Sequence, residues 1–251
     1  MKVALLGLGE AGRAFAGDLV QEGLSVSAYD PQPVQTPART RRAPSIPDAV
    51  KGADLVFSIN LAAVSVEVAR AAAAAAHPGQ VYADLNTAAP ETKRRVARVL
   101  PGEVLVADVA LLAPVPGRGI RTPALASGPG APAFAEIMTP FGMPVSVIGA
   151  EIGAASSRKL VRSVFMKGLA AAVLECLEAA ERLDCEAWSR EQIQAVLKDD
   201  GLLERLVSGS RAHAARRVHE MVAARELMVE VGVSPFIADA ALQRLEALRD
   251  G

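Results

Sequence analysis

The first thirty residues follow an order that few folds can accommodate. A strand-like run, Lys2 to Leu6, leads into a glycine-rich turn and then into the helical stretch Ala11 to Gln21. A second strand-like run, Ser25 to Tyr29, ends in Asp30. Parallel strands need a long crossover between them, and an α-helix is the usual one. This β–α–β unit therefore predicts a parallel sheet with helices packed on its faces.

The same alternation continues as far as residue 152. Short apolar and β-branched runs bounded by Gly, Pro, Asp or Asn are typical of strands buried on both faces. We expect strands at Val3–Leu6, Ser25–Tyr29, Leu55–Ile59, Val81–Leu85, Val104–Ala107, Ala124–Ser127 and Val145–Ile148. Helices are expected at Ala11–Gln21, Val64–Ala75 and Pro90–Leu100, and the Pro- and Arg-rich stretch 31–47 is expected to be irregular.

The pattern changes after Gly153, beyond which the sequence shows no convincing strand. Residues 154–183 contain no Pro and one internal Gly, so they predict a single long helix. Further helices are expected at Arg190–Lys198, Gly201–Val207, Ala212–Val231 and Pro235–Leu248. The fold class is therefore α/β: a Rossmann-type doubly wound sheet over residues 1–152, followed by an all-α domain over residues 153–251, with the long helix joining them.

Composition excludes several classes of partner. The chain has 251 residues, a net charge of −1 and only 4% aromatic residues. Nucleic-acid binding is not expected, because it needs a basic surface or aromatic stacking platforms. The alanine tract 71–76 is too short to span a bilayer, and the chain opens on a strand rather than on a secretion signal. We therefore expect a soluble protein that binds neither nucleic acid nor membrane.

Cys176 and Cys185 both fall in helical sequence, and two thiols make a poor disulfide framework. Reduced thiols suit a cytoplasmic location, which we therefore expect. No pair of histidines is supported by carboxylates at the spacing of metal ligands, and neither cysteine pairs with histidines at such spacing, so no metal is expected.

The turn after the first strand has the spacing of a dinucleotide-binding fingerprint. It reads Gly7-Leu8-Gly9-Glu10-Ala11-Gly12, follows a strand and opens a helix, as the fingerprint requires. The first glycine allows the tight turn, the second lets the backbone approach a pyrophosphate, and the third lets helix and strand pack closely. The helix N-terminus also offers unpaired N–H groups to the phosphates. We expect these six residues to bind a dinucleotide.

Asp30 ends the second strand, where an acid commonly accepts hydrogen bonds from the ribose hydroxyls of NAD. A carboxylate at this place repels the 2′-phosphate of NADP. Arg39, Arg41 and Arg42 follow closely, and they are either partners for such a phosphate or part of a solvated loop. The cofactor is expected to be NAD or NADP, with NAD favoured.

Three motifs in order resemble the β-hydroxyacid dehydrogenase superfamily, which includes 3-hydroxyisobutyrate and 6-phosphogluconate dehydrogenases. The first is the glycine turn. The second, Asp84-Leu85-Asn86-Thr87-Ala88-Ala89-Pro90, is similar to the family's D-x-(S/N)-(T/S)-x-x-P loop. The third, Gly153 followed six residues later by Lys159, is similar to the segment that opens the family's interdomain helix. The segment 159–169 resembles a branch of phosphogluconate-dehydrogenase-like NAD-binding proteins.

The resemblance implies roles for these positions. Lys159 matches the catalytic lysine that exchanges a proton with the substrate hydroxyl while hydride moves to or from the nicotinamide. Asn86 and Thr87 match the loop beside the nicotinamide, and Asn86 is also expected at the catalytic site. Asn and Thr before Pro90 also suit helix capping. Asn60 and Leu61 match a further cofactor-contacting position. All these residues follow strand ends, where ligands bind in open parallel sheets.

The chain departs from the family pattern at two substrate positions. The family's asparagine four residues after the lysine is replaced by Ser163, which we expect at the catalytic site. The family's S-G-G turn, which grips a substrate carboxylate through backbone N–H groups, is replaced by Ala110-Leu111-Leu112, followed shortly by Pro114. These three residues are expected to contact the substrate, but the altered turn does not predict a simple 3-hydroxyisobutyrate-like one.

Arg162, Ser163 and Lys167 follow Lys159 at i+3, i+4 and i+8, so they share its helix face. Arg162 and Lys167 are therefore expected to bind an acidic or phosphorylated substrate. The alternative is that these charges pack against acids elsewhere, such as Glu175.

The sequence thus predicts an NAD(P)-dependent oxidoreductase acting on a small hydroxy acid or its carbonyl form. Two alternatives stay open: an imine reductase of the same fold, against which the retained Lys159 argues, and a dinucleotide-binding sensor without turnover. Relatives associate through their helical domains, and the apolar stretch 169–177 needs cover, so a homodimer is expected.

Overall fold

The computed structural model describes residues 1–199 and 201–250; Asp200 and Gly251, the last residue of the expected second domain, lie outside the described residues. The chain forms two compact units, residues 1–159 and the residues from 160 onward. The division falls within α6 (Ala154–Arg182), so one continuous helix belongs to both units.

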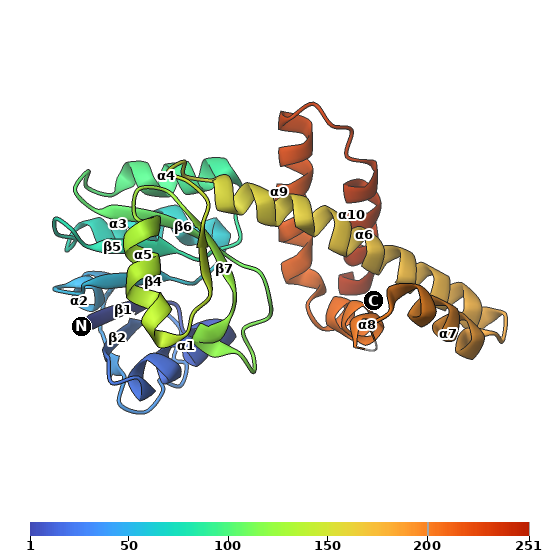
Figure 1. Ribbon diagram of the computed structural model, residues 1–251, viewed down its shortest axis with the longest axis horizontal. Coiled ribbons are helices and arrows are strands. Elements are labelled where there is room, and N and C mark those ends of the chain that lie inside the picture. The colour runs from blue at the N-terminus through green and yellow to red at the C-terminus, as the bar shows by residue number, and fades with distance from the viewer. Residues whose placement is uncertain (200, 251) are drawn as a thin grey trace. The chain divides into compact units, whose positions relative to one another are not determined.

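The first unit is built on one sheet (Figure 1). Within the described residues its eight strands lie in the order β3-β2-β1-β4-β5-β6-β7-β8. β7 runs antiparallel to β6, and every other neighbouring pair is parallel. The strands are β1 (Lys2–Leu6), β2 (Ser25–Tyr29), β3 (Arg41–Arg42), β4 (Leu55–Ser58), β5 (Val81–Asp84), β6 (Leu105–Leu111), β7 (Ala124–Ser127) and β8 (Val145–Val147).

Helices cover both faces of this sheet, which explains why its strands read as continuous apolar runs. Along β1, Val3 and Leu5 join one apolar cluster with residues of α1 and α5, while Ala4 and Leu6 join another with α2, α3 and α4. The helices are α1 (Glu10–Gln21), α2 (Ile46–Val50), α3 (Ser65–Ala73), α4 (Pro90–Val99) and α5 (Ala131–Met138), with 3₁₀ turns at Ala62–Val64, Gly119–Arg121 and Thr139–Phe141. The doubly wound α/β prediction is confirmed.

Three short elements lie where the sequence predicts none. β3 and α2 fall in or beside the stretch expected to be irregular; the Ser45 side chain accepts a hydrogen bond from the Asp48 N–H and so starts α2. α5 begins within a Gly- and Pro-rich run, residues 128–132, whose composition suggests a loop. In each case pairing or packing against the sheet outweighs weak local propensity.

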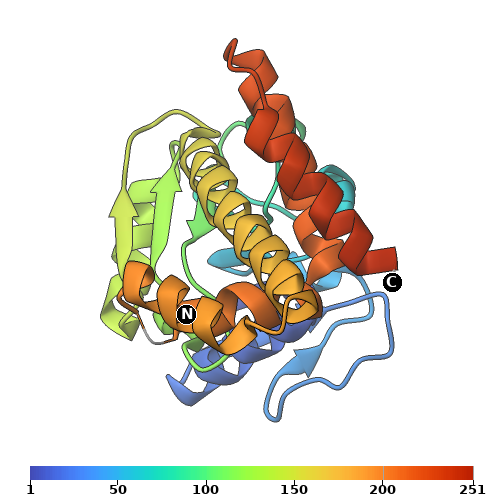
Figure 2. The ribbon, with the colours of Figure 1, turned by 90° about the vertical axis from the view of Figure 1, so that its right-hand side faces the viewer.

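The second unit is entirely helical over its described residues. α6 has 29 residues, about 44 Å at the usual rise of about 1.5 Å per residue. It is followed by α7 (Glu186–Leu197), α8 (Leu202–Ala212), α9 (Ala214–Glu230) and α10 (Phe236–Asp250). α9 and α10 lie side by side (Figure 1, Figure 2), joined through Gly232 at a φ of +74°. No helix among the described residues is both long and apolar enough to cross a bilayer.

Candidate active site

The glycine turn after β1 leaves room at one glycine and none at the other two. A Cβ on Gly7 would collide with the Ile59 carbonyl oxygen, and one on Gly12 would collide with the Gly7 carbonyl oxygen. Gly7 also has a φ of +115°, which favours glycine. At Gly9, by contrast, nothing lies within 4 Å of an added Cβ. The turn therefore exposes backbone at Gly9, as close approach of a pyrophosphate requires.

The other fingerprint residues support this opening. Leu8 is fully buried in the core, Ala11 packs on the same core, and Glu10 is exposed at the first position of α1. The first intrahelical hydrogen bond runs from Arg13 N–H to the Gly9 carbonyl oxygen. The N–H groups of a first helical turn have no partner inside the helix, so they are available to an anion.

Asp30 lies directly beside this turn. One carboxylate oxygen accepts a hydrogen bond from the Leu8 N–H at 2.7 Å, and the other accepts one from the Gln32 N–H at 2.8 Å. A carboxylate has about four acceptor positions. The two hydrogen bonds from Leu8 and Gln32 therefore leave positions that can accept from ribose hydroxyls. Asp30 thus shapes the turn and still presents an acid at the end of β2.

Two of the three arginines that follow Asp30 are engaged with the backbone. The Arg42 guanidinium donates to the carbonyl oxygens of Val34, Asp30 and Gln32, and Arg41 donates to the Asp48 carbonyl oxygen. Arg39 is exposed, with a positive φ of 63°. Arg41 and Arg42 therefore stabilise the loop after β2 through hydrogen bonds to backbone carbonyl oxygens.

The residues after β4 and β5 are joined by a polar network. The Asn86 side chain accepts from the Asn60 N–H at 2.6 Å and donates to Asp84 Oδ1 at 2.6 Å and to Ser58 Oγ at 3.1 Å. Asn86 is only 4% exposed, so its amide holds two loops together rather than facing solvent. Asn60 Oδ1 is buried without a hydrogen-bond partner, and Leu61 is 72% exposed at the same strand end.

Lys159, in the second turn of α6, reaches the loop after β5. Its Nζ donates a hydrogen bond to Thr87 Oγ1 at 2.7 Å, and both side chains are half-buried. Since β5, β4 and β1 are neighbours in the sheet, their carboxyl ends bring Thr87, Asn60 and the glycine turn to one edge.

A second lysine, for which the sequence predicted no role, lies beneath this loop. Lys93 on α4 is 1% exposed, and its Nζ lies 3.3 Å from Asp84 Oδ2 and 3.4 Å from Asp108 Oδ1. Burial raises the pKa of Asp84 above its usual value, against the opposing charge of Lys93. One signal in the sequence points to Lys93, which follows Pro90 by three residues and precedes Val96 by three. This spacing places Lys93 on the same helix face as Pro90 and Val96, and all three are buried in α4.

The segment expected to grip a substrate carboxylate is part of the sheet. Ala110 and Leu111 end β6 and pair with Leu125 and Ala124 of β7. The Leu112 N–H donates to the Pro123 carbonyl oxygen at 2.8 Å. This N–H is already used, so the segment lacks the open donor turn of the family pattern.

Within the second unit, α6 carries a buried ion pair. Lys167 Nζ lies 2.8 Å from Glu220 Oε2 of α9 and donates to Ser163 Oγ at 3.4 Å. Ser163 and Glu220 are buried, at 4% and 8% exposure, and Arg162 is exposed. Lys167 thus pairs with an acid, as the alternative interpretation held, but the acid is Glu220 rather than Glu175.

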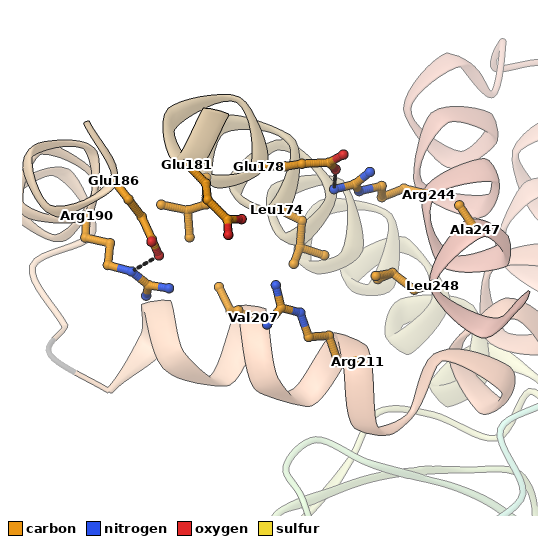
Figure 3. Close-up of a pocket in the computed structure, with 11 residues that line it drawn as sticks. Leu174, Glu178, Glu181, Glu186, Arg190, Val207, Arg211, Arg244, Ala247 and Leu248 are labelled. Atoms are coloured by element: carbon orange, nitrogen blue, oxygen red, sulfur yellow. Dashed lines mark hydrogen bonds and ion pairs between the residues drawn. The ribbon is translucent and has the colours of Figure 1, made fainter. Parts of the chain in front are cut away.

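The second unit also contains a cavity of about 330 Å³ between α6, α7, α8 and α10. Its lining combines apolar side chains with three glutamates and three arginines, and two pairs, Glu186–Arg190 and Glu178–Arg244, are in contact. Figure 3 shows Glu181 and Arg211 extending toward the same space. Because the three glutamates balance the three arginines, the cavity lining carries no net positive charge that would attract an anion.

Over residues 1–199 and 201–250, no three His, Cys, Asp or Glu side chains are grouped to hold a metal ion. Both cysteines are unpaired thiols; Cys176 is exposed and Cys185 is half-buried.

Two family models match the chain. Residues 2–117 match the NAD binding domain of 6-phosphogluconate dehydrogenase, and residues 180–248 match a domain of unknown function, DUF1932. The first match covers β1 to β6 and includes the glycine turn, Asp30, Asn60 and the loop of Asn86 and Thr87.

Several solved structures are similar to this chain over almost its whole length. A conserved hypothetical protein from Sinorhizobium meliloti 1021 is 30% identical, with 98% of this chain and 87% of that chain covered, at a TM-score of 0.75. A conserved protein of unknown function, described as structurally similar to 3-hydroxyacid dehydrogenases, is 27% identical, with 100% and 97% covered, at 0.76. Mycobacterium tuberculosis 3-hydroxyisobutyrate dehydrogenase with L-serine shares the fold at 19% identity, with 98% and 92% covered, at 0.79.

Proposed function

The chain belongs to the β-hydroxyacid dehydrogenase superfamily, and on that premise we propose that it is an NAD(P)-dependent oxidoreductase acting on a small hydroxy acid or its carbonyl form. The observation that carries the proposal is the hydrogen bond between Lys159 and Thr87 at 2.7 Å. It brings a half-buried amine to the sheet edge where the glycine turn ends β1. An amine able to hold a proton there is what oxidation of a hydroxyl demands.

The residues at this edge fit a nicotinamide dinucleotide. The backbone at Gly9 and the first turn of α1 would hold the pyrophosphate, and Asp30 would accept from the adenosine ribose. Asn60, Leu61 and Thr87 would border the nicotinamide, and Asn86 would hold their loops in place. The bound nucleotide would supply the hydride acceptor or donor. The buried, unpartnered Asn60 Oδ1 is an acceptor suited to an amide or hydroxyl donor there.

Lys159 would act on the proton of the substrate. When a hydroxyl is oxidised, its proton must leave as hydride leaves the carbon, and Lys159 Nζ would take that proton. In the reverse direction Nζ would return the proton to the carbonyl oxygen. Thr87 would orient the amine by accepting one of its hydrogen bonds, which fixes the direction of the remaining donors.

The charged side chains on α6 limit the kind of substrate that would fit. Lys167 is paired with Glu220, so it adds little net charge for a phosphate. Arg158 and Arg162 are both exposed on this part of α6, and Arg162, three residues after Lys159, would meet an acidic group. A substrate with one carboxylate therefore fits better than one with an additional phosphate.

The loop after β2 favours NAD over NADP. Asp30 would repel a 2′-phosphate, and Arg41 and Arg42 already donate to backbone carbonyl oxygens. Arg39 alone would have to pair with the extra phosphate.

An imine reductase of the same fold is the first alternative. Lys159 argues against it, since an ammonium beside the ring serves a hydroxyl–carbonyl pair. A dinucleotide-binding sensor is the second. The replaced S-G-G turn suits a sensor, because the Leu112 N–H cannot reach a substrate carboxylate while it is bonded to Pro123.

The test starts from the purified chain with NADH and NADPH. Binding is followed by nucleotide fluorescence, and turnover is followed at 340 nm with 3-hydroxyisobutyrate, L-serine, 6-phosphogluconate and a set of aldehydes and imines. We expect turnover of a hydroxy acid, and its loss in Lys159→Met with nucleotide affinity retained. Turnover of imines alone supports the reductase. Tight binding with no turnover by either the parent or the variant supports the sensor.

We also propose a cytoplasmic homodimer associated through the helical unit. Its described surface exposes large apolar side chains on α9, α10 and the loop between them: Val229, Val233, Phe236 and Ile237, each more than half exposed. Such a surface is typical of a protein–protein interface.

A further inference from the structure

We propose that Lys93, Asp84 and Asp108 form a buried positioning cluster that fixes the start of α6 and thereby holds Lys159 against Thr87. This inference rests on the proposed function, since it concerns how the amine of that site is placed. The whole cluster lies within the first unit. None of its three members touches the proposed substrate directly, so each is a positioning residue.

Lys93 links the ends of two strands. Its Nζ donates to the Asp84 carbonyl oxygen at 2.8 Å and lies between the carboxylates of Asp84 and Asp108. Asp84 ends β5, three residues before Thr87, and it pairs in register with Asp108 of β6. The ammonium therefore ties the beginning of the Thr87 loop to the neighbouring strand.

Asp108 links that strand to α6. Its Oδ2 accepts from the Ser156 N–H at 3.0 Å, and its Oδ1 accepts from the Ser156 hydroxyl at 2.6 Å. Ser156 lies in the first turn of α6, three residues before Lys159. The carboxylate thus replaces a helix-capping side chain and holds this residue at two atoms.

Ser127 of β7 adds a second anchor. Its Oγ accepts from the Ala155 N–H at 3.0 Å and donates to Asp108 Oδ2 at 3.3 Å. Two successive amides of the first turn are therefore bound to side chains of two neighbouring strands. These bonds set both the axial position and the rotation of the helix, and Lys159 follows within one turn.

Stability alone does not account for a buried charge cluster. Three charged groups at 1–2% exposure lose their hydration, and apolar residues of similar volume often stabilise a fold as well or better. What such groups supply is directional bonding. Here every bond runs along the path from the Thr87 loop to the first turn of α6, which favours a role in geometry.

Adjacent serines provide a matched test. Ser156 bonds to Asp108, whereas Ser157, one residue further along, bonds to the Gly153 carbonyl oxygen at 2.9 Å and has no bond to the cluster. We compare Ser156→Ala, Ser157→Ala and the rescue variant Ser156→Thr in the full-length chain. Ser127→Ala tests the second anchor. Melting temperatures, read by circular dichroism, establish that each variant is folded.

Two readouts separate positioning from folding. On the best substrate of the panel, Ser156→Ala is expected to lower kcat about ten- to hundredfold, the scale of a misplaced catalytic group, with KM for NADH close to the parent value. Ser157→Ala should match the parent, and Ser156→Thr should recover most of kcat. Equal loss in both serine variants, or no loss in either, overturns the proposal.

The second readout needs no turnover. Lysines are reductively methylated with ¹³C-formaldehyde, and the Lys159 resonance is identified by its absence in Lys159→Arg. We expect Ser156→Ala to move this resonance toward those of exposed lysines and Ser157→Ala to leave it in place. An unmoved resonance in Ser156→Ala overturns the positioning role. If no substrate turns over yet the resonance moves, the proposed function fails while the positioning role stands.

Discussion

Lys159 Nζ donates to Thr87 Oγ1 at 2.7 Å across 72 residues of sequence. The donor lies on the helix that leaves the sheet domain, and the acceptor lies on the loop that ends its central strand β5. The contact lies at the carboxyl ends of the neighbouring strands β1, β4 and β5. It determines where Lys159 Nζ, the proposed proton acceptor, lies.

Replacing Thr87 by Val removes the hydroxyl while keeping the shape. A hydrogen bond to a charged group contributes about 1.5–3 kcal/mol, so kcat/KM should fall about ten- to hundredfold. Thr87→Ser keeps the hydroxyl and should stay near the parent. Steady-state rates on the substrate panel measure this, and equal activity of Val and Ser variants would show that the contact does not matter.

Gly9 and Gly12 should respond oppositely to alanine. Gly9 has an ordinary φ of −63° and open space at its Cβ position, so Gly9→Ala should keep the parent melting temperature and weaken NADH binding at least about tenfold. Gly12→Ala would press a Cβ on the Gly7 carbonyl oxygen and should cost about 1–3 kcal/mol of folding free energy. Urea unfolding and NADH fluorescence titration measure both. Unchanged NADH affinity in Gly9→Ala would contradict the pyrophosphate assignment.

Arg42 should stabilise the loop after β2 and should not affect the preference between NADH and NADPH. Its guanidinium donates to three carbonyl oxygens, so Arg42→Lys is expected to lower the melting temperature while leaving the ratio of NADH to NADPH affinities near that of the parent. Arg39→Ala is the comparison variant: Arg39 is exposed, so its loss should leave the melting temperature unchanged, and any binding of NADPH should weaken. Thermal shifts with each nucleotide provide the measurement, and a selective loss of NADPH binding in Arg42→Lys would assign this residue to the 2′-phosphate.

Asp84 should make stability depend on pH in a defined direction. Burial raises its pKa above the ordinary aspartate value of 3.8, so the folded state holds this proton more tightly than the unfolded chain does. The stability that the neutral form contributes is complete below pH 3.8 and is lost as pH rises through the folded-state pKa.

Asp84→Asn lacks this titration. The free energy of unfolding of the variant, relative to the parent, should therefore increase between pH 4 and neutral pH. Urea unfolding of both proteins at pH 4, 5.5 and 7.5 measures the difference. A difference that is constant, or that falls with pH, would mean that folding does not raise the pKa of Asp84.

The apolar side chains exposed along α9 and α10 predict a dimer. Light scattering should give twice the chain mass of 26.1 kDa. Phe236→Asp with Ile237→Asp should shift the mass toward that of one chain, because both side chains are more than half exposed and are not needed to fill the core. Val147→Asp, on the edge strand β8, is the control. A parent protein of monomer mass would reject the prediction.

The larger elements were predictable from the sequence because their signals are local. Strand runs such as Val3–Leu6 and the helix over residues 154–182 follow from periodicity and from the absence of breakers. α5 and β3 were missed because a Gly- and Pro-rich start and a two-residue strand carry almost no local signal. The arginines at 41 and 42 illustrate a similar limit, since their carbonyl partners belong to a loop whose path no pattern describes.

The sequence by itself determined the β–α–β start, the glycine turn and the long helix, because glycine spacing, apolar periodicity and the absence of helix breakers are patterns within a few neighbouring residues. Only the tertiary structure decided that Lys93 is buried between two aspartates, that Lys167 pairs with Glu220, and that Lys159 meets Thr87. These contacts depend on the order of strands in the sheet and on the packing of helices, which bring distant residues together.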